Sequence, residues 1–170
     1  MKNQIKAISI VSLFAAVFSV SAAQQDITVT AQIDPTVDIT LDDGSPLPTT
    51  ATMQYLPGKG LGDYSRQVKL WSNNVDRDLL VSLVNSPSLT DETGTNDIAL
   101  KVTLNGSELS TSSKTMTYAT TFPNGIEHGS TVMPLVISQA TPGLITKAGR
   151  YTGIVSIVVA QAAAAQNSGN

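Results

Sequence analysis

Hydrophobic and polar residues alternate with a period of two along several stretches of this chain, a pattern typical of β-strands with one buried face. The clearest run is Asp97–Leu104, where every even-numbered position is a large apolar residue. Weaker alternation marks Arg66–Trp71, in which Val68 and Leu70 share one face. A further set repeats the spacing: Leu79, Val81 and Leu83. These runs predict separate strands that pack around one core.

Turn signals separate the apolar runs. They are Asp42–Gly44, Pro57–Gly58, Asn105–Gly106, Asn124–Gly125 and Pro142–Gly143. The short apolar run Met133–Ser138 contains Pro134, which favours an edge strand or the start of a strand. No stretch of ten or more residues shows a clear helical period. Seven or more short strands at this spacing predict an all-β sandwich of the immunoglobulin-like class.

The alternation does not lapse between Ile27 and Leu41, which is unusual for a small sandwich. One continuous strand would be about 50 Å long at 3.3–3.4 Å per residue, far beyond the usual length. Pro35 divides the segment, because it cannot donate a ladder hydrogen bond and restricts the residue before it. We therefore predict two strands, Ile27–Ile33 and Thr36–Leu41.

Two readings of the first strand stay open at this point. It is either an ordinary first strand of the sandwich, or a segment that leaves its own domain and completes the sheet of a neighbour. Burial with a period of two looks the same in both cases. The apolar positions concerned are Ile27, Val29, Ala31 and Ile33.

The carboxyl-terminal segment Arg150–Ala160 also reads as a strand with one apolar face. The positions that share this face are Tyr151, Gly153, Val155, Ile157 and Val159. Most of them are expected in the core, but Gly153 leaves a gap on the inward face.

The first residues have the order of a secretory signal peptide. Lys2 and Lys6 precede the mostly apolar stretch Ala7–Val20, and small residues allow cleavage after Ala22 or Ala23. This stretch is too short to span a bilayer comfortably, and it has no polar face with which to lie along a membrane surface. We therefore expect export of a soluble product from the cytoplasm.

Composition excludes several classes of protein. The 170 residues suit one domain, and the 10 basic against 13 acidic residues, without a basic run, argue against a nucleic-acid partner. The chain has no cysteine and one histidine, so a disulfide, a thiolate nucleophile and a site of several imidazoles are all ruled out. Abundant threonine and serine fit half-buried strands.

Catalytic and metal-binding readings are weak. Glu127 and His128 resemble an acid–base pair, but neighbours on a strand point to opposite faces, and a solvated loop explains them better. Asp38, Asp42 and Asp43 do not match the spacing of a calcium loop, and a plain turn is favoured. We expect no enzymatic activity, no metal and no cofactor.

Two surface features leave other readings to weigh. The Asn105–Ser107 sequon also reads as a hairpin turn, which is the reading we favour. Trp71 can stack on a sugar, although a tryptophan in a strand pattern more often packs. A monomeric secreted or periplasmic carbohydrate-binding β-sandwich that uses Trp71 is therefore the alternative function.

The two ends of the chain together resemble a known family. ITVTAQIDPTVDITL near the amino terminus and AGRYTGIVSIVV near the carboxyl terminus are similar to segments of the major pilins of the alternate chaperone–usher class. These are the fimbriae of the colonization factor antigen I type and the related cable pili. Smaller echoes are DGSPLP at Asp43–Pro48 and SPSLTD at Ser86–Asp91.

The resemblance implies an incomplete immunoglobulin-like sandwich that is completed by a strand from a neighbouring molecule. Its organisation would be a signal peptide (1–22), a donor extension (23–35), a pilin domain (36–160) and a flexible polar tail (161–170). The donor residues would be Ile27, Val29, Ala31 and Ile33. The strand at the groove edge, with which the chaperone pairs, would carry Tyr151, Gly153, Val155, Ile157 and Val159.

The implied partners are identical subunits in a homopolymer, a periplasmic chaperone, an outer-membrane usher and a tip adhesin. The implied function is that of the major subunit of an adhesive fimbria on the cell surface, which supports attachment to host cells or surfaces. Two departures stand out: the tail Gln161–Asn170 extends beyond the usual end of the family, and Thr111–Ser130 does not align by eye.

Overall fold

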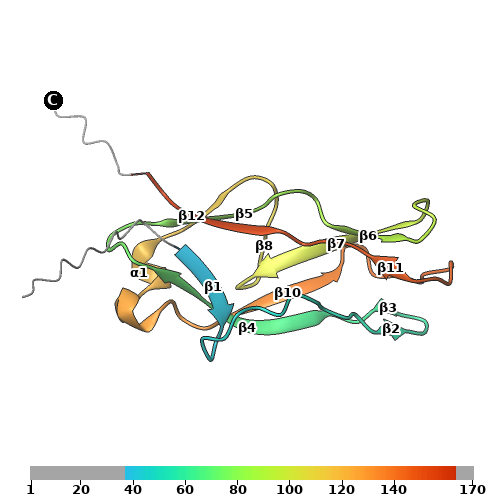
Figure 1. Ribbon diagram of the computed structural model, residues 1–170, viewed down its shortest axis with the longest axis horizontal. Helices are drawn as coiled ribbons and strands as arrows, with labels where there is room; N and C mark the ends of the chain where they lie inside the picture. Colours follow the sequence, from blue (N-terminus) through green and yellow to red (C-terminus); the bar gives the residue numbers. More distant parts are fainter. Residues whose placement is uncertain (1–36, 164–170) are drawn as a thin grey trace, which may run out of the picture. The chain divides into compact units, whose positions relative to one another are not determined.

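The structure, a computed structural model, describes residues 37–163, which belong to one compact unit, Ile33–Asn170. The strands are β1 (Val37–Leu41), β2 (Tyr55–Leu56), β3 (Gly60–Leu61), β4 (Tyr64–Ser72), β5 (Leu79–Leu83), β6 (Ser88–Asp91), β7 (Asp97–Leu104), β8 (Ser107–Glu108), β9 (Lys114–Met116), β10 (Met133–Gln139), β11 (Tyr151–Thr152) and β12 (Ile157–Gln161). Two short helical turns, α1 (Tyr118–Thr121) and the 3-10 turn η1 (Ile126–His128), complete the unit (Figure 1).

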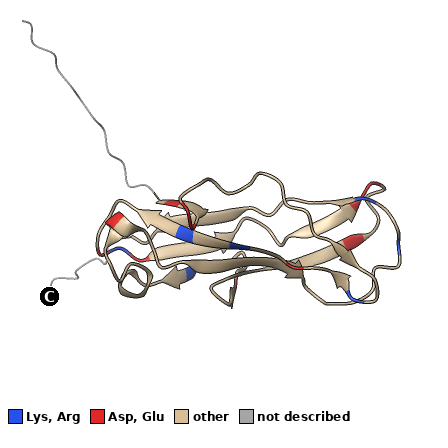
Figure 2. Ribbon diagram, turned by 90° about the horizontal axis from the view of Figure 1, so that it is seen from below, with Lys and Arg blue, Asp and Glu red and all other residues tan. Residues whose placement is uncertain are grey.

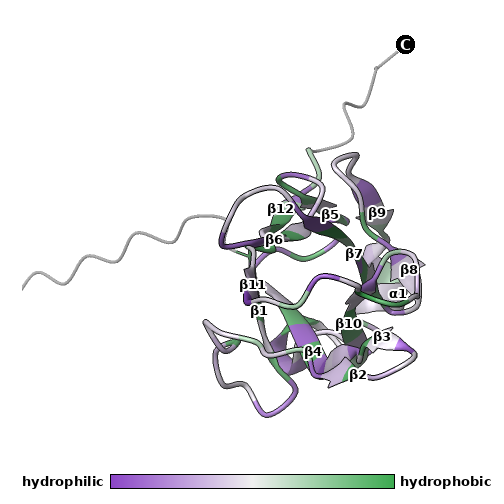
Figure 3. Ribbon diagram, turned by 90° about the vertical axis from the view of Figure 1, so that its right-hand side faces the viewer, coloured by the Kyte–Doolittle hydropathy of each residue, from purple (hydrophilic) through white to green (hydrophobic). Residues whose placement is uncertain are grey.

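The strands form two main sheets. The larger has the order β1-β4-β10-β7-β6-β11, with β8 beside β7, and the smaller has the order β12-β5-β9. A small β2-β3 hairpin stands apart. Figure 3 looks along the layers, with β12, β5 and β9 above β4 and β10. This confirms the all-β, immunoglobulin-like sandwich predicted from the sequence.

The core lies between the two sheets and uses the predicted apolar faces. In β7 the even-numbered residues are buried and the odd-numbered ones are exposed or half-buried, as the alternation predicted. β5 shows the same pattern, with Leu79, Val81 and Leu83 buried. Val68 and Leu70 of β4 are fully buried against them. Period-two patterning therefore placed the main core strands correctly.

Proline and glycine fix the points where strands start and turn. Pro134 lies at the second residue of β10, before the pairing of β10 with β7 begins at Leu135. β10 is a central strand, so the strand-start reading of Pro134 is confirmed and the edge-strand reading is wrong. Asn105 and Gly106 both have positive φ, at 50° and 72°, in the tight turn between β7 and β8. They form the predicted hairpin turn.

The structure corrects the carboxyl-terminal strand. The sequence predicted one strand over this region, whereas β11 pairs with β6 of the larger sheet and β12 pairs with β5 of the smaller one. Between them, residues 153–156 cross from one sheet to the other. β12 extends through Gln161, the first residue of the predicted tail, and the Gln161 side chain donates a hydrogen bond to Ser72 Oγ (3.0 Å).

Candidate functional site: an open seam in the sandwich

Two strand edges face each other across one side of the unit without a partner among the described residues. β11 and β12 pair with β6 and β5 on one edge only. β1 pairs with β4 on one edge, and its other edge meets only an isolated bridge from Thr40 to Pro46. Unpaired backbone amides and carbonyls of this kind are a template for another strand. We call the gap between these two edges the seam.

A groove of about 1120 Å³ opens along the seam. Its floor is made of apolar side chains from both sheets. They are Leu89, Ile98, Leu100, Leu135, Ile137, Val155 and Ile157. Such a floor gains stability when an apolar strand covers it, because burial removes its surface from water.

The hydrophobic core is incomplete beside the groove. Three apolar residues of β1 pack against the core but stay half-buried: Val37, Ile39 and Leu41. Val155, Ile157 and Val159 on the opposite edge do the same. Further along this edge Ile154 is 77% exposed. The sandwich therefore ends on both sides of the seam in apolar residues that no described residue covers fully.

Gly153 is required where the chain crosses between the sheets. A Cβ atom at this position would collide with the backbone carbonyl oxygen of Ser88 and would lie 3.2 Å from Leu89 Cα. A side chain would therefore push β11 away from β6. The sequence identified Gly153 as a gap on an inward face, and the structure gives its cause as close contact between two backbones.

The predicted groove-edge residues are brought together in part. Tyr151, Gly153, Val155 and Ile157 line the groove, whereas Val159 packs against the core beyond it. The predicted donor residues Ile27, Val29, Ala31 and Ile33 lie outside the described residues.

Sequence reasoning missed two loops that form the groove walls. The segment from Leu47 to Met53 lines one wall, and the segment from Ile145 to Arg150 lines the other. Neither loop has a periodic pattern from which its position could be predicted. The only signal was the DGSPLP echo, which ends in Leu47 and Pro48, and Leu47 packs against the core.

The end of the groove beside Tyr151, which we call the mouth, carries basic groups. Arg66, Lys147 and Arg150 all line the groove and are exposed. The Arg66 guanidinium lies 4.5 Å from the centroid of the Tyr64 ring, a cation–π contact. Figure 2 shows that charged positions are sparse along the sheets and recur at the turns of its right-hand end. The mouth therefore offers cations to an incoming segment.

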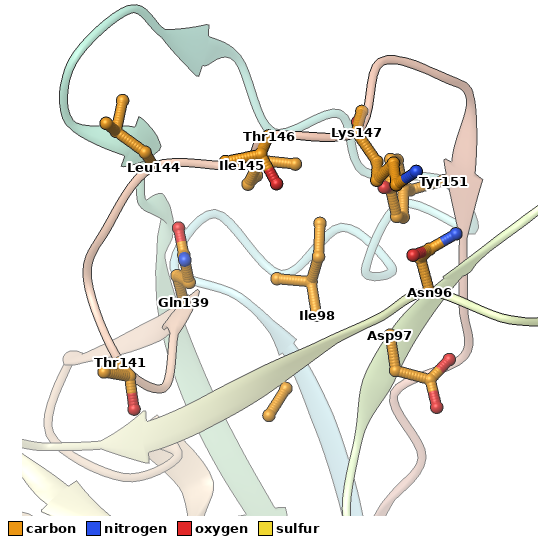
Figure 4. A pocket seen from close by; sticks show the side chains of 11 residues that line it. Asn96, Asp97, Ile98, Gln139, Thr141, Leu144, Ile145, Thr146, Lys147 and Tyr151 are labelled. Carbon is orange, nitrogen blue, oxygen red and sulfur yellow. The ribbon is translucent and has the colours of Figure 1, made fainter.

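A smaller pocket of about 310 Å³ adjoins the mouth (Figure 4). Asn96, Gln139, Lys147 and Tyr151 line it. Gln139 is already engaged, because its Oε1 accepts a hydrogen bond from the backbone N–H of Leu61 (3.0 Å). This pocket shares Lys147 and Tyr151 with the groove, so we treat it as part of the mouth.

A hydrogen-bonded loop fixes the strand on which β11 rests. Asp91 accepts bonds from Asn96 Nδ2 (2.6 Å) and Thr93 Oγ1 (2.9 Å) and from the Thr95 backbone N–H (3.0 Å). These bonds, first that from Asn96, hold the pKa of the Asp91 carboxyl well below its ordinary value. Asp91 also pairs with Tyr151 in the β6–β11 register. The loop thereby steadies the mouth.

The other candidate sites have structural roles. Trp71 donates a hydrogen bond from Nε1 to Thr40 Oγ1 (2.8 Å), and its ring packs so closely on Gly129 that a Cβ there would lie 3.1 Å away. Both polar and apolar parts of Trp71 are therefore used in packing, which removes support from the sugar-binding reading. Glu127 and His128 are exposed in η1.

The calcium reading gains no support either. Within residues 37–163, no three histidine, aspartate or glutamate side chains gather closely enough to hold a metal ion. Asp43 instead accepts hydrogen bonds from the side chain and backbone N–H of Ser45, which lower the pKa of its carboxyl. This is the behaviour of the plain turn that the sequence favoured.

Comparison with known proteins places this open sandwich in a defined class. Residues 23–160 match the family of CS1 type fimbrial major subunits. A CFA/I fimbrial protein of Escherichia coli O78:H11 (strain H10407 / ETEC), one of the subunits of that fimbria, is 34% identical over 167 residues, covering 93% of this chain and 96% of that protein. A CS1 fimbrial protein of Escherichia coli, likewise one of its subunits, is 31% identical over 170 residues, covering 94% and 96%.

Structural comparison agrees with the sequence comparison. The CooA pilin from enterotoxigenic Escherichia coli superposes with a TM-score of 0.66 at 26% identity, over 75% of this chain and 88% of that one. The fold and the seam thus define a pilin. The chain belongs to the CS1 type fimbrial major subunit family, which confirms the resemblance noted in the sequence.

Family membership sets the general role of the protein. It is a structural component of a fimbria, of a class whose relatives are fimbrial subunits and not enzymes, and its place is the cell surface. No helix among residues 37–163 is both long and apolar enough to cross a membrane.

Proposed function

We propose that this protein forms the shaft of an adhesive fimbria by donor-strand exchange, in which residues 27–33 of one copy fill the groove of the next. The observation that carries the proposal is the seam: an apolar groove between two unpaired strand edges, in a chain whose amino-terminal segment has the alternation of a strand. Strand addition to a free sheet edge satisfies the backbone, and alternate side chains fill the groove.

The energetic argument rests on both backbone and side chains. Each fully buried valine or isoleucine contributes about 1.5–3 kcal/mol relative to exposure. Ile27, Val29 and Ile33 are large enough to contribute in this way, and Ala31 fits a shallow point. The even-numbered residues of the extension, among them Thr28 and Thr30, would face outward. Because the donating segment and the groove are different surfaces, the contact does not close and a filament grows.

The same groove requires protection before assembly, since an open apolar edge invites uncontrolled pairing. We infer that a periplasmic chaperone lends a strand to the edge formed by Tyr151, Gly153, Val155, Ile157 and Val159, and that an outer-membrane usher exchanges it for the next extension. Export would follow removal of residues 1–22. A tip adhesin at the end of the shaft, and attachment to host cells or surfaces, complete the proposed function.

Substitutions at neighbouring positions of the extension test the proposal. Val29→Asp would place a charge in the apolar groove, whereas Thr30→Asp would place the same charge on the outer face. We expect the first variant to fold but to leave cells without fimbriae in negative-stain electron microscopy, and the second to assemble normally. Normal fimbriae from Val29→Asp, or from a chain that lacks residues 24–34, would overturn the proposal.

A further inference from the structure

We propose that Asp34 of one copy pairs with Arg150 of the next, and that this ion pair fixes the register in which the extension enters the groove. The inference rests on the proposed function and adds to it a direction, a register and a recognition charge. It follows from where the ends of the unit lie, from the spacing of residues along the seam and from the charges at the mouth.

The two ends of the unit have different roles. Val37, the start of β1, pairs with Ser72 at the end of β4, and Gln161 at the end of β12 bonds to the same serine. The extension therefore leaves the unit at this end. The mouth lies at the opposite end, beside β11, β2 and β3 (Figure 1).

A filament in which all copies point the same way dictates the direction of the inserted strand. The extension of one copy must enter its neighbour at the mouth, so the residues nearest the donor's own sandwich stay at the mouth. Only Pro35 and Thr36 separate Asp34 from β1. Ile33 thus lies near Tyr151, and Ile27 lies deeper, antiparallel to the edge strand. A parallel strand would bring the Val37 ends of two copies together and break the common direction.

Side-chain size selects among the antiparallel registers. Residues 27–33 and residues 151–157 are equal in length, and apolar positions alternate in both. Placing Ile33 opposite Tyr151 puts the small Ala31 opposite Gly153, where the edge strand is tightest against β6. A shift of two residues would place Ala31 opposite Val155 or would bring Val29 to Gly153. The first register therefore matches small with small and large with large.

The same register aligns charges. Asp34 falls directly opposite Arg150, while the other acid of the extension, Asp26, falls opposite Val158, an exposed apolar residue of β12. Arg150 is exposed at the mouth, and no carboxylate among residues 37–163 contacts it. Opposite charges at directly facing positions of antiparallel strands stabilise the pairing. Arg150 therefore recognises the last residue of the inserted strand.

Cysteine mapping in assembled fimbriae tests the register, because the natural chain has no cysteine. Full-chain variants carry Gln32→Cys together with a second cysteine at Thr152, Ile154 or Arg150. A disulfide forms only between Cα atoms about 4.4–6.8 Å apart, which directly opposite residues satisfy and diagonal neighbours exceed. Single-cysteine variants serve as controls, and mild oxidation is followed by non-reducing electrophoresis.

We expect a ladder of covalent oligomers from the variant with Gln32→Cys and Thr152→Cys, and little from the other two. A ladder that is strongest for Ile154 or Arg150, or no ladder from any pair in fimbriae that assemble normally, would overturn the register. Fimbriae that assemble without residues 24–34 would instead overturn the proposed function. The two failures are therefore distinguishable.

Charge reversal tests the ion pair separately. Asp34→Lys and Arg150→Glu should each speed the release of subunits from fimbriae in urea at low salt, by about two- to fivefold, as the strength of a cross-strand charge pair implies. The double variant should return toward the natural rate. Asp26→Lys is the matched control, and combining it with Arg150→Glu should give no recovery. Failure of the Asp34–Arg150 pair to recover, or equal recovery with Asp26, would overturn the ion pair.

Discussion

Replacing Gly153 by alanine is the sharpest test of how the edge strand is held. The added Cβ would collide with the Ser88 carbonyl oxygen and would lie 3.0 Å from the Ser88 carbonyl carbon and 3.2 Å from Leu89 Cα. All of these atoms belong to the backbone of β6, which cannot move aside as a flexible side chain does. We expect β11 to separate from β6, with loss of the pairs that Tyr151 and Thr152 make.

The magnitude follows from two opposing effects. Overpacking against a rigid neighbour costs about 1–3 kcal/mol. Alanine also restricts the unfolded chain, which stabilises the folded state by about 0.4–1 kcal/mol where the backbone fits. Gly149→Ala isolates this second effect, because the nearest atom to its Cβ is Tyr151 Cε2 at 3.9 Å. The Gly153 variant should therefore be less stable than the Gly149 variant by about 1–3 kcal/mol.

Urea unfolding measures this difference through the fluorescence of Trp71, the single tryptophan of the chain. Full-chain proteins are compared at one concentration, after sedimentation has shown that they are in the same assembly state. Equal unfolding midpoints for the two alanine variants would refute the backbone contact at Gly153, and with it the reason for the crossing between sheets.

Three further predictions follow from the core, the loop and the tryptophan. Leu70→Ala, at a fully buried position, should lower the free energy of unfolding by about 2–5 kcal/mol, as measured by urea titration. Asp91 has a pKa below its ordinary value of 3.8, so the stability that it contributes is present above pH 4 and is lost as the pH falls; the difference in melting temperature between the natural chain and Asp91→Ala should shrink below pH 4. Trp71→Phe should cost about 0.5–1.5 kcal/mol through the lost bond to Thr40, and titration with sugars should leave Trp71 fluorescence unchanged.

The apolar pattern predicted the strands whose burial depends on alternation alone. β7 and β5 match their predicted residues, because each has one face on the core and little else constrains it. The turn at Asn105 and Gly106 was also predictable, since positive φ restricts the residues that can occupy it.

Features that depend on contacts between distant segments were not predictable. The edge strand reads as one run in the sequence, but the approach of Ser88 to Gly153 and the pairing with two different sheets divide it. The groove walls come from irregular loops around Leu47 and Ile145, which carry no period. The groove itself could be expected only from the resemblance to pilins, because an absent strand leaves no pattern in the residues that surround it.

The most direct test of the account is a reconstruction of the intact fimbria by electron cryomicroscopy, at a resolution that traces the backbone. The account predicts a strand in the seam, between β1 and the edge formed by β11 and β12, that continues into Pro35 and Val37 of a neighbouring copy. An empty seam, or one that is filled by the extension of the same copy, would contradict it.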